Sequence, residues 1–307
     1  MLSYEFIDPG EEIGTEDFRF VENFLKSTAR TQIGWHYITD ITWIYSRVKD
    51  WSRNLKIVDA GGGRGPLQFL LAELGFNVVN IDMTLTEVPK AYRRRYGTRL
   101  QRLGSCKPTG YEAYIHAASQ GRFLYRLKTA IARAPLYQRW KAWKYEQAHD
   151  RWRMRAGILD RQVGTIKWVR GNLCGLPEIA SDTFDAVVSL SALEHIPLGD
   201  LDAAVQEIHR ILKPNARWAV TTSGTEQPQT WFHHPSQACC FSVADLERIF
   251  EAQAGRAQDP DEMLEKYRQC AYLRYRLADF YKRSGQFGMP WGIWDPKYIP
   301  VGLTQGN

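Results

Sequence analysis

A glycine-rich segment, Asp59-Ala60-Gly61-Gly62-Gly63-Arg64-Gly65, has the residue types that bring a small ligand close to the main chain. Glycine has no Cβ atom, so the backbone can turn sharply and approach a ligand without a clash. Asp82 adds a carboxylate further along the chain, and a carboxylate can accept hydrogen bonds from both hydroxyls of a ribose. We therefore predict a site for a ribose-containing ligand. The simpler alternatives are a ligand-free turn and an Asp82 that only caps the segment after it.

The spacing of these glycines argues against two common nucleotide sites. A dinucleotide site needs Gly-x-Gly-x-x-Gly, and a match that begins at Gly61 meets Pro66 where the third glycine belongs. Matches that begin at the next two glycines meet Arg64 and Gln68 at required glycine positions. No Gly-Lys-Ser/Thr follows, so the segment is not a phosphate-binding P-loop. A nicotinamide-dependent oxidoreductase is therefore disfavoured.

The elements that must position this segment alternate between strands and helices. A strand at 55–60, the glycine turn, a helix at 66–74 and a strand at 77–82 predict a βαβ unit. The alternation resumes later in the chain, with strands at 165–169, 184–190 and 216–222 and helices at 198–212 and 242–250. Such alternation is typical of a parallel sheet covered by helices on both faces.

The two ends of the chain are predicted to surround this core. Helices at 15–27, capped by Thr15, and at 32–51 predict an N-terminal helical cap over residues 1–52. Near the other end we expect one long helix at 261–283 and an edge strand at 298–301.

Six short motifs, in this order, resemble the class I S-adenosylmethionine-dependent methyltransferases. They cover roughly residues 55–90 and 165–225 and are most similar to the branch with many small-molecule enzymes. The motifs are Asp59 to Gly65, Asn80-Ile81-Asp82, Gly171-Asn172-Leu173-Cys174-Gly175-Leu176-Pro177, Phe184-Asp185-Ala186-Val187-Val188-Ser189, Ala192-Leu193-Glu194-His195-Ile196 and Leu212-Lys213-Pro214. The resemblance implies a doubly wound, Rossmann-like α/β fold with a mostly parallel sheet of about seven strands. It also implies S-adenosyl-L-methionine as the cofactor.

The resemblance assigns roles around the methionine and ribose parts of the cofactor. Gly61, Gly63 and Gly65 would line the methionine part, and Asp59 would lie near its amino end. Asp82 would hold the ribose.

The resemblance also assigns residues near the rest of the cofactor. Asn172 and Leu173 would flank the adenine, and Ser191 or Leu193 would lie beside the cofactor, with Met83 among the expected contacts. The family often has Asp at the position of Asn172, but an amide oxygen can still accept a hydrogen bond from the adenine amino group.

Histidines are the natural candidates for a base, because methyl transfer to a hydroxyl benefits from a group with a pKa near neutrality. His195 lies in the fifth motif, His233 and His234 follow the strand at 216–222, and His36 lies in an aromatic helix. We expect His233 or His234 to be the base, because long loops carry substrate contacts, with His195 as a further candidate. A structural role is the alternative for each. A metal site is disfavoured, because no third ligand has a suitable spacing.

Positive charge is concentrated in one stretch. Between Pro89 and Lys167 there are 19 Lys and Arg against four Asp and Glu, whereas the rest of the chain has 21 and 30. We predict a basic helical insertion at 89–165, a lid candidate that holds an anionic acceptor through Arg151, Arg153 and Arg155. Hydrophobic residues recur at helical spacing in it, namely Phe123, Leu127, Ala130, Ile131, Leu136, Trp140 and Trp143. The alternatives are a solvated elaboration whose Trp residues pack on the main domain, an RNA contact, and peripheral contact with a membrane.

Length and composition fit a single methyltransferase domain over residues 1–307. The chain is 44% hydrophobic, and no apolar run reaches the roughly 18 residues of a membrane span. The start of the chain lacks signal-peptide features, and the five cysteines show no paired framework, so we expect a cytoplasmic protein without a metal. The expected reaction is O-methylation of a small molecule or a glycan intermediate. The rival functions are RNA methylation and a non-catalytic subunit that binds S-adenosylmethionine.

Overall fold

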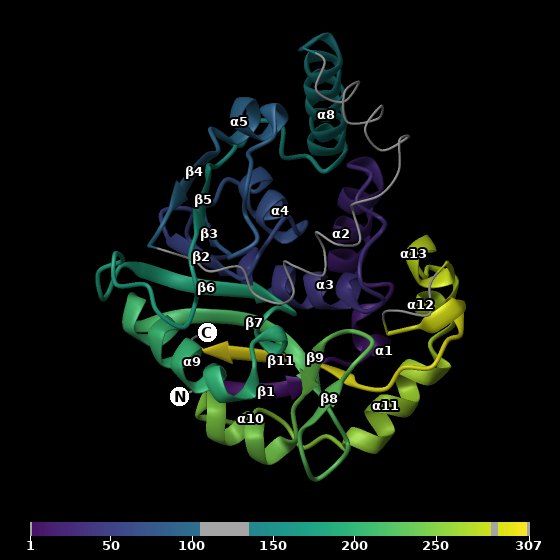
Figure 1. Ribbon diagram of the computed structural model, residues 1–307. Helices are drawn as coiled ribbons and strands as arrows, with labels where there is room; N and C mark the ends of the chain where they lie inside the picture. The colour runs from purple at the N-terminus through teal and green to yellow at the C-terminus, as the bar shows by residue number, and fades with distance from the viewer. Residues whose placement is uncertain (1, 105–134, 284–287, 306–307) are drawn as a thin grey trace, which may run out of the picture.

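A nine-stranded sheet runs through the computed structural model, which describes residues 2–104, 135–283 and 288–305 (Figure 1). The strand order is β10-β1-β11-β7-β6-β2-β3-β5-β4. The strands are β1 (Leu2–Phe6), β2 (Lys56–Ala60), β3 (Asn77–Ile81), β4 (Arg99–Arg102), β5 (Ile166–Arg170), β6 (Phe184–Leu190), β7 (Leu212–Gly224), β10 (Ala252–Ala254) and β11 (Ile299–Gln305). A separate hairpin is formed by β8 (Trp231–His233) and β9 (Ala238–Cys240).

Helices follow most of the strands, as the alternation predicts. They are α1 (Pro9–Glu12), α2 (Glu16–Ser27), α3 (Tyr37–Val48), α4 (Leu67–Glu73), α5 (Lys90–Tyr96), α8 (Pro135–Arg155), α9 (Leu198–Ile211), α10 (Val243–Phe250), α11 (Pro260–Gln269), α12 (Ala271–Tyr275) and α13 (Asp279–Lys282). Two short 3₁₀ turns lie at Leu193–His195 and Pro290–Gly292. Thr15 accepts a hydrogen bond from the backbone N–H of Phe18 at 3.1 Å and so caps α2, as expected.

The predicted fold class is confirmed: the protein is α/β with a mostly parallel, Rossmann-like sheet. Among the described strands of the nine-stranded sheet, β11 is the one that runs antiparallel to its neighbours. The sheet has two strands more than the expected seven. The N-terminal segment contributes β1, and the chain after α5 contributes β4 at the far edge.

One prediction about the ends of the chain is wrong, because long-range pairing decides it. The N-terminal segment contains helices α1, α2 and α3, as expected, but it begins with β1, which lies inside the sheet. The expected edge strand near residue 300 is also interior: β11 pairs with β1 on one side and β7 on the other. Neither partner lies near β11 in the sequence, so no local pattern indicates this position.

The single helix expected at 261–283 is also wrong. It is divided into α11, α12 and α13. Helix α11 ends at Gln269, and the next residue, Cys270, has an extended backbone with φ −70° and ψ 93°. No Gly or Pro within this stretch marks the breaks. Tertiary packing therefore overrides a continuous helical pattern here.

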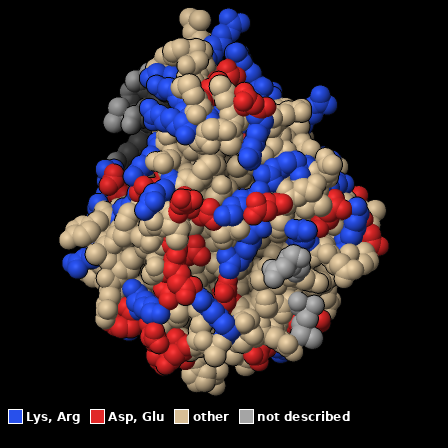
Figure 2. All heavy atoms as spheres, turned by 180° about the vertical axis from the view of Figure 1, so that it is seen from behind, with Lys and Arg blue, Asp and Glu red and all other residues tan. Residues whose placement is uncertain are grey.

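The basic insertion contributes α5, β4 and α8, and it extends beyond the sheet edge beside α2 (Figure 1). Lys and Arg side chains gather in this upper part of the molecule when it is viewed from behind (Figure 2). Trp152 anchors α8, since its ring lies 4.9 Å from that of Phe24. The alternative in which Trp140 and Trp143 pack on the main domain is not supported, because these residues are 47% and 53% exposed. Leu136 is exposed as well. The other hydrophobic residues expected at helical spacing lie outside the described ranges: Phe123, Leu127, Ala130 and Ile131.

Buried Glu73, at the end of α4, joins the insertion to this helix. Its carboxylate accepts hydrogen bonds from Arg95 Nε at 2.5 Å and His149 Nδ1 at 2.9 Å, and Arg153 Nη1 lies 3.4 Å from it. Burial alone would raise the pKa of Glu73, but its hydrogen bonds to His149 and Arg95 and their charges lower the pKa to about 2. Arg153 is 2% exposed and also donates to the carbonyl of Ile158, so its predicted role in an anion-binding lid is wrong.

Candidate functional site

The glycine loop, residues 59–65, lies between the carboxyl end of β2 and the start of α4. Gly61 has φ +74°, a conformation that favours glycine. A Cβ atom on Gly61 would lie 2.6 Å from Cβ of Ala192, and one on Gly62 would overlap the Asp59 carboxylate. There is therefore no room for a side chain at Gly61 or Gly62.

Two buried side chains hold the loop in this shape. Asn80 Nδ2 donates to the carbonyl oxygen of Gly63 at 2.7 Å, and Gln68 Nε2 donates to the same oxygen at 3.0 Å. Gln68 is itself fixed, because its Oε1 accepts from Trp168 Nε1 at 2.7 Å. The loop is thus preorganised by α4, β3 and β5, which the glycine spacing alone does not predict.

Asp82 directly follows β3 and faces the same loop. Its Oδ2 accepts from the backbone N–H of Gly63 at 3.0 Å, and its Oδ1 accepts from the backbone N–H of Thr84 at 2.6 Å. Asp82 therefore caps the turn after it and also contacts the glycine loop. The side chain is half-buried, and its oxygens retain lone pairs that can accept further hydrogen bonds.

Asp59 presents a buried carboxyl group with unsatisfied oxygens. The residue is 1% exposed, and neither carboxyl oxygen has a hydrogen-bond partner among the described residues. Burial, reinforced by the negative charge of Asp82, raises the pKa of Asp59 to about 8. A buried polar group without a partner is costly, so this position suits a ligand that brings a donor or a positive charge.

The other expected cofactor contacts differ in their burial, and Leu173 lies beside Gly61 of the loop. Leu173 and Leu193 are buried, and Leu173 Cδ1 would lie 3.9 Å from a Cβ on Gly61. Asn172 is exposed, and its side-chain oxygen already accepts from the backbone N–H of Cys174 at 3.1 Å. Met83 is half-buried next to Asp82.

Ser191 connects the loop region to α3. It follows β6 with φ +43°, and its hydroxyl donates to Asp40 Oδ2 at 2.7 Å. The same Asp40 oxygen lies 2.9 Å from His36 Nδ1. Asp40 and His36 are both buried, and Asp40 Oδ1 has no partner among the described residues. Because Ala192 abuts Gly61, the His36–Asp40 pair and the glycine loop lie on two sides of one turn.

Glu194 adds a second acidic group near this pair. It is 3% exposed and accepts a hydrogen bond from Thr222 Oγ1 at 3.1 Å. Burial raises the pKa of Glu194 to about 7, with the charge of Asp40 acting in the same direction and His36 opposing it. A carboxyl group that titrates near neutrality is typical of functional sites.

The three histidines expected to act as bases differ in their surroundings. His195 is exposed and donates from Nδ1 to the carbonyl oxygen of Gln237 at 2.8 Å, so the ring's lone pair is on Nε2. His233 is buried, with Nδ1 2.7 Å from Ser236 Oγ, and burial lowers its pKa to about 4. His234 is exposed on the turn between β8 and β9.

Sequence reasoning missed Asp40 and Glu194. The spacing of His36 and Asp40 places them one turn apart on a helix, which could have paired them. The bond between Asp40 and Ser191 spans 151 positions and has no local signal.

The matched family is described as a methyltransferase domain, and its model covers residues 40–255. No curated protein matches the chain by sequence. Solved structures similar to it include the N1-methyltransferase of 1,6-didemethyltoxoflavin from Burkholderia thailandensis (14% identity, 97% of this chain and 90% of that chain, TM-score 0.43). Another is an S-adenosylmethionine-dependent methyltransferase from Methanosarcina mazei (13% identity, 83% of this chain and 93% of that chain, TM-score 0.40). A third is the [4+2]-cyclase SpnF (14% identity, 94% of this chain and 93% of that chain, TM-score 0.48).

The family match covers more than half of the chain and includes the glycine loop, Asp82 and Glu194. It agrees with the class suggested by the sequence motifs and with the observed Rossmann-like sheet. The chain therefore belongs to this methyltransferase family, as an enzyme that uses S-adenosylmethionine as its methyl donor.

Proposed function

We propose that the enzyme methylates a hydroxyl oxygen of a small molecule or a glycan intermediate. The observation that carries this proposal is the buried His36–Asp40 pair beside the glycine loop. The methyl group on the sulfonium is already electrophilic. The acceptor hydroxyl is the partner that benefits from a base, which takes its proton as the oxygen attacks. We treat residues 1–307 as one domain, with residues 1–52 and 89–165 as elaborations beside the site.

The residues around the glycine loop fit S-adenosylmethionine. In this proposal Asp59 receives the ammonium group of the methionine part, and Asp82 receives the ribose hydroxyls. The backbone of Gly61, Gly63 and Gly65 lines the methionine part. The unsatisfied carboxyl oxygens of Asp59 support the assignment, because a cationic ligand would satisfy them.

The remaining contacts in this proposal lie around the adenine. Leu173 and Leu193 provide apolar surface, with Asn172, Ser191 and Met83 completing the site.

His36 has the geometry of a base held by a carboxylate. Asp40 accepts a hydrogen bond from Nδ1–H of the ring, so the lone pair of neutral His36 is on Nε2. Nε2 would take the proton of the acceptor hydroxyl as its oxygen attacks the methyl group. The hydroxyl of Ser191 fixes Asp40 from the other side.

His195, His233 and His234 are the competing candidates for this role. The low pKa of His233, about 4, makes it a weak base at neutral pH. His195 donates from Nδ1 to the carbonyl oxygen of Gln237, and His234 is exposed on the turn between β8 and β9. Glutamine substitutions at each of the four histidines separate these roles.

The proposal is tested by following the methyl group. The enzyme is incubated with ¹³C-methyl S-adenosylmethionine and a panel of sugars, sugar phosphates and phenols. We expect a methyl ether, recognised by the ¹³C chemical shift of a methyl on oxygen. A product methylated on nitrogen or carbon would refute oxygen as the acceptor atom, and methylation of RNA alone would favour the rival function.

Replacing Gly61 with Ala should weaken cofactor binding. The positive φ costs an alanine about 1–2 kcal/mol, and the new Cβ would meet Ala192 at 2.6 Å. We expect the Kd of S-adenosylhomocysteine to rise at least about tenfold, as measured by calorimetry. Gly199→Ala is the matched control, because nothing lies within 4 Å of its Cβ position. Equal effects of the two substitutions would show that the loop does not hold the cofactor.

Cofactor affinity should rise with pH between 6 and 8. The pKa of Asp59 is raised to about 8, so its carboxyl group is mostly protonated below that pH. Binding an ammonium group favours the ionised form and releases a proton, which increases affinity by up to about tenfold per pH unit. Titrations in buffers with different ionisation enthalpies measure the released proton. Asp59→Asn should abolish this release, and a wild-type affinity independent of pH would contradict the role of Asp59.

A further inference from the structure

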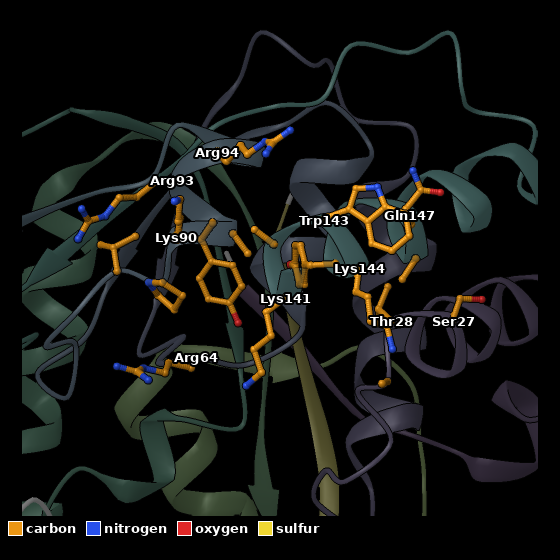
Figure 3. A pocket seen from close by; sticks show the side chains of 18 of the residues that line it. Ser27, Thr28, Arg64, Lys90, Arg93, Arg94, Lys141, Trp143, Lys144 and Gln147 are labelled. Carbon is orange, nitrogen blue, oxygen red and sulfur yellow. The ribbon is translucent and has the colours of Figure 1, made fainter. Parts of the chain in front are cut away.

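A large cleft, which we name the basic cleft, opens between the basic insertion and the glycine loop. Its volume is about 1580 Å³, above the usual range for small-molecule sites. The walls come from the end of α2 at 27–29, Arg64 of the glycine loop, residues 87–94 and one face of α8 at 141–151 (Figure 3). Arg64 thus belongs to both the loop and the cleft, so a ligand in this basic cleft lies beside the cofactor site.

The lining of the basic cleft is strongly positive. Seven of its described residues are cationic, and Glu87 is the one acidic residue described in the wall: the cations are Arg64, Lys90, Arg93, Arg94, Lys141, Lys144 and Arg151. Within the described part of the chain, Arg94 alone among them forms an ion pair, with Glu146 at 2.7 Å. In Figure 3, Lys141 extends from α8 toward the side where Arg64 lies, and Arg93 and Arg94 lie along the opposite edge. Six of the seven cations therefore form no ion pair with a carboxylate of the described residues.

A further cation lies behind this wall. The guanidinium of Arg30 stacks on Phe69 at 3.9 Å and donates to the hydroxyls of Tyr92 and Tyr145, two residues that line the cleft. No carboxylate pairs with Arg30 among the described residues, and its buried Nε has no hydrogen-bond partner there. This arrangement adds a positive potential that no carboxylate of the described residues neutralises through an ion pair.

S-adenosylmethionine does not account for this charge. It has a sulfonium, an ammonium and one carboxylate, and it contains no phosphate. A cluster of Lys and Arg is the usual protein partner of phosphate groups, since Arg binds them through two parallel hydrogen bonds and Lys through its point charge. The second substrate is therefore the ligand whose charge can match the cleft.

We propose that the basic cleft binds a phosphate or pyrophosphate group of the methyl acceptor. This inference rests on the proposed function, since it assigns the acceptor a chemical class within the same site. Many nucleotide-linked and lipid-linked sugars contain a pyrophosphate, and in this proposal the sugar extends toward the glycine loop. The exposed Lys141, Lys144 and Arg151 recur at helical spacing on the cleft face of α8.

Binding of pyrophosphate to the purified full-length protein tests the inference. Calorimetry at low salt is performed on wild type, on the Lys141→Gln/Arg151→Gln variant and on a matched control, Arg139→Gln/Arg155→Gln. Arg139 and Arg155 are exposed on the same helix but do not line the cleft. We expect the first variant to bind pyrophosphate at least about tenfold more weakly and the control to bind like wild type. S-adenosylhomocysteine should bind all three proteins equally.

Two further ligands distinguish the source of the pyrophosphate. Uridine diphosphate represents nucleotide-linked acceptors and farnesyl diphosphate represents lipid-linked ones. Binding of either that is lost in the cleft variant and retained in the control supports the inference and selects the source.

The possible failures are distinguishable. Wild type that binds S-adenosylhomocysteine but no pyrophosphate overturns the basic-cleft inference and leaves the proposed function intact. Wild type that binds neither ligand overturns both. If pyrophosphate binding is weakened equally in Lys141→Gln/Arg151→Gln and in Arg139→Gln/Arg155→Gln, the effect comes from overall charge. That result overturns the proposed site. Tight, steeply salt-dependent binding of a single-stranded RNA, with no binding of pyrophosphate, overturns it in favour of nucleic acid.

Discussion

Replacing His36 with Gln is expected to lower kcat by about two to four orders of magnitude and to leave the affinity for S-adenosylhomocysteine unchanged. Gln keeps a polar side chain of similar size but cannot take a proton from the acceptor. His36 is buried, and its Nδ1 is engaged by Asp40 at 2.9 Å, so the ring is held in one orientation. Initial rates with a methylated-product assay, together with calorimetry, measure the two effects separately.

Asp40→Asn tests the same arrangement from the other side. An amide can present its NH₂ group to Nδ1 and so favour the wrong tautomer, which should also reduce kcat. Initial rates of Asp40→Asn and of wild type measure this reduction. If His36→Gln keeps wild-type kcat while His195→Gln or His234→Gln loses it, the base is not His36.

Replacing Glu73 with Ala should destabilise the protein by about 3–5 kcal/mol. The substitution leaves Arg95, His149 and Arg153 without their shared carboxylate in a buried site. Urea denaturation, followed by tryptophan fluorescence, measures the free energy of unfolding. Glu146→Ala is the control, because the pair it forms with the exposed Arg94 is a surface pair worth about 0–1 kcal/mol. A loss at Glu73 no larger than at Glu146 would contradict the anchoring role.

The same carboxylate predicts a direction for acid unfolding. The pKa of Glu73 is lowered to about 2 in the folded protein, against 4.5 for an ordinary glutamate. A depressed pKa means that the stabilisation is fully present above about pH 4.5 and is lost as the pH falls toward 2. The difference in stability between wild type and Glu73→Gln should therefore shrink over this interval.

The parts of the fold that depend on local pattern are predictable from the sequence. The βαβ unit follows from the change of period around the glycine loop, and the start of α2 follows from Thr15. The position of β11 is not predictable this way, because its neighbour β1 comes from the opposite end of the chain. The strand pattern of residues 299–305 is the same whether that strand is interior or at an edge.

The candidate site is likewise only partly predictable from the sequence. Asp59 and Asp82 follow directly from motif and strand position, and the structure adds the buried state of Asp59. The pairing of Asp40 with Ser191 depends on the packing of α3 against β6, which no spacing shows. Arg153 illustrates the opposite error. The sequence groups it with Arg151, but residues two positions apart on a helix face different ways, and Arg153 faces Glu73.

The most direct test of the account is calorimetric titration of S-adenosylhomocysteine into wild type, Asp82→Ala and Asp160→Ala. Asp82 contacts the glycine loop through Gly63, whereas Asp160 is exposed outside the candidate site. We predict binding to wild type and to Asp160→Ala, and binding at least about tenfold weaker to Asp82→Ala. No binding to wild type, or equal binding to all three proteins, would contradict the assignment of this loop as the methyl-donor site.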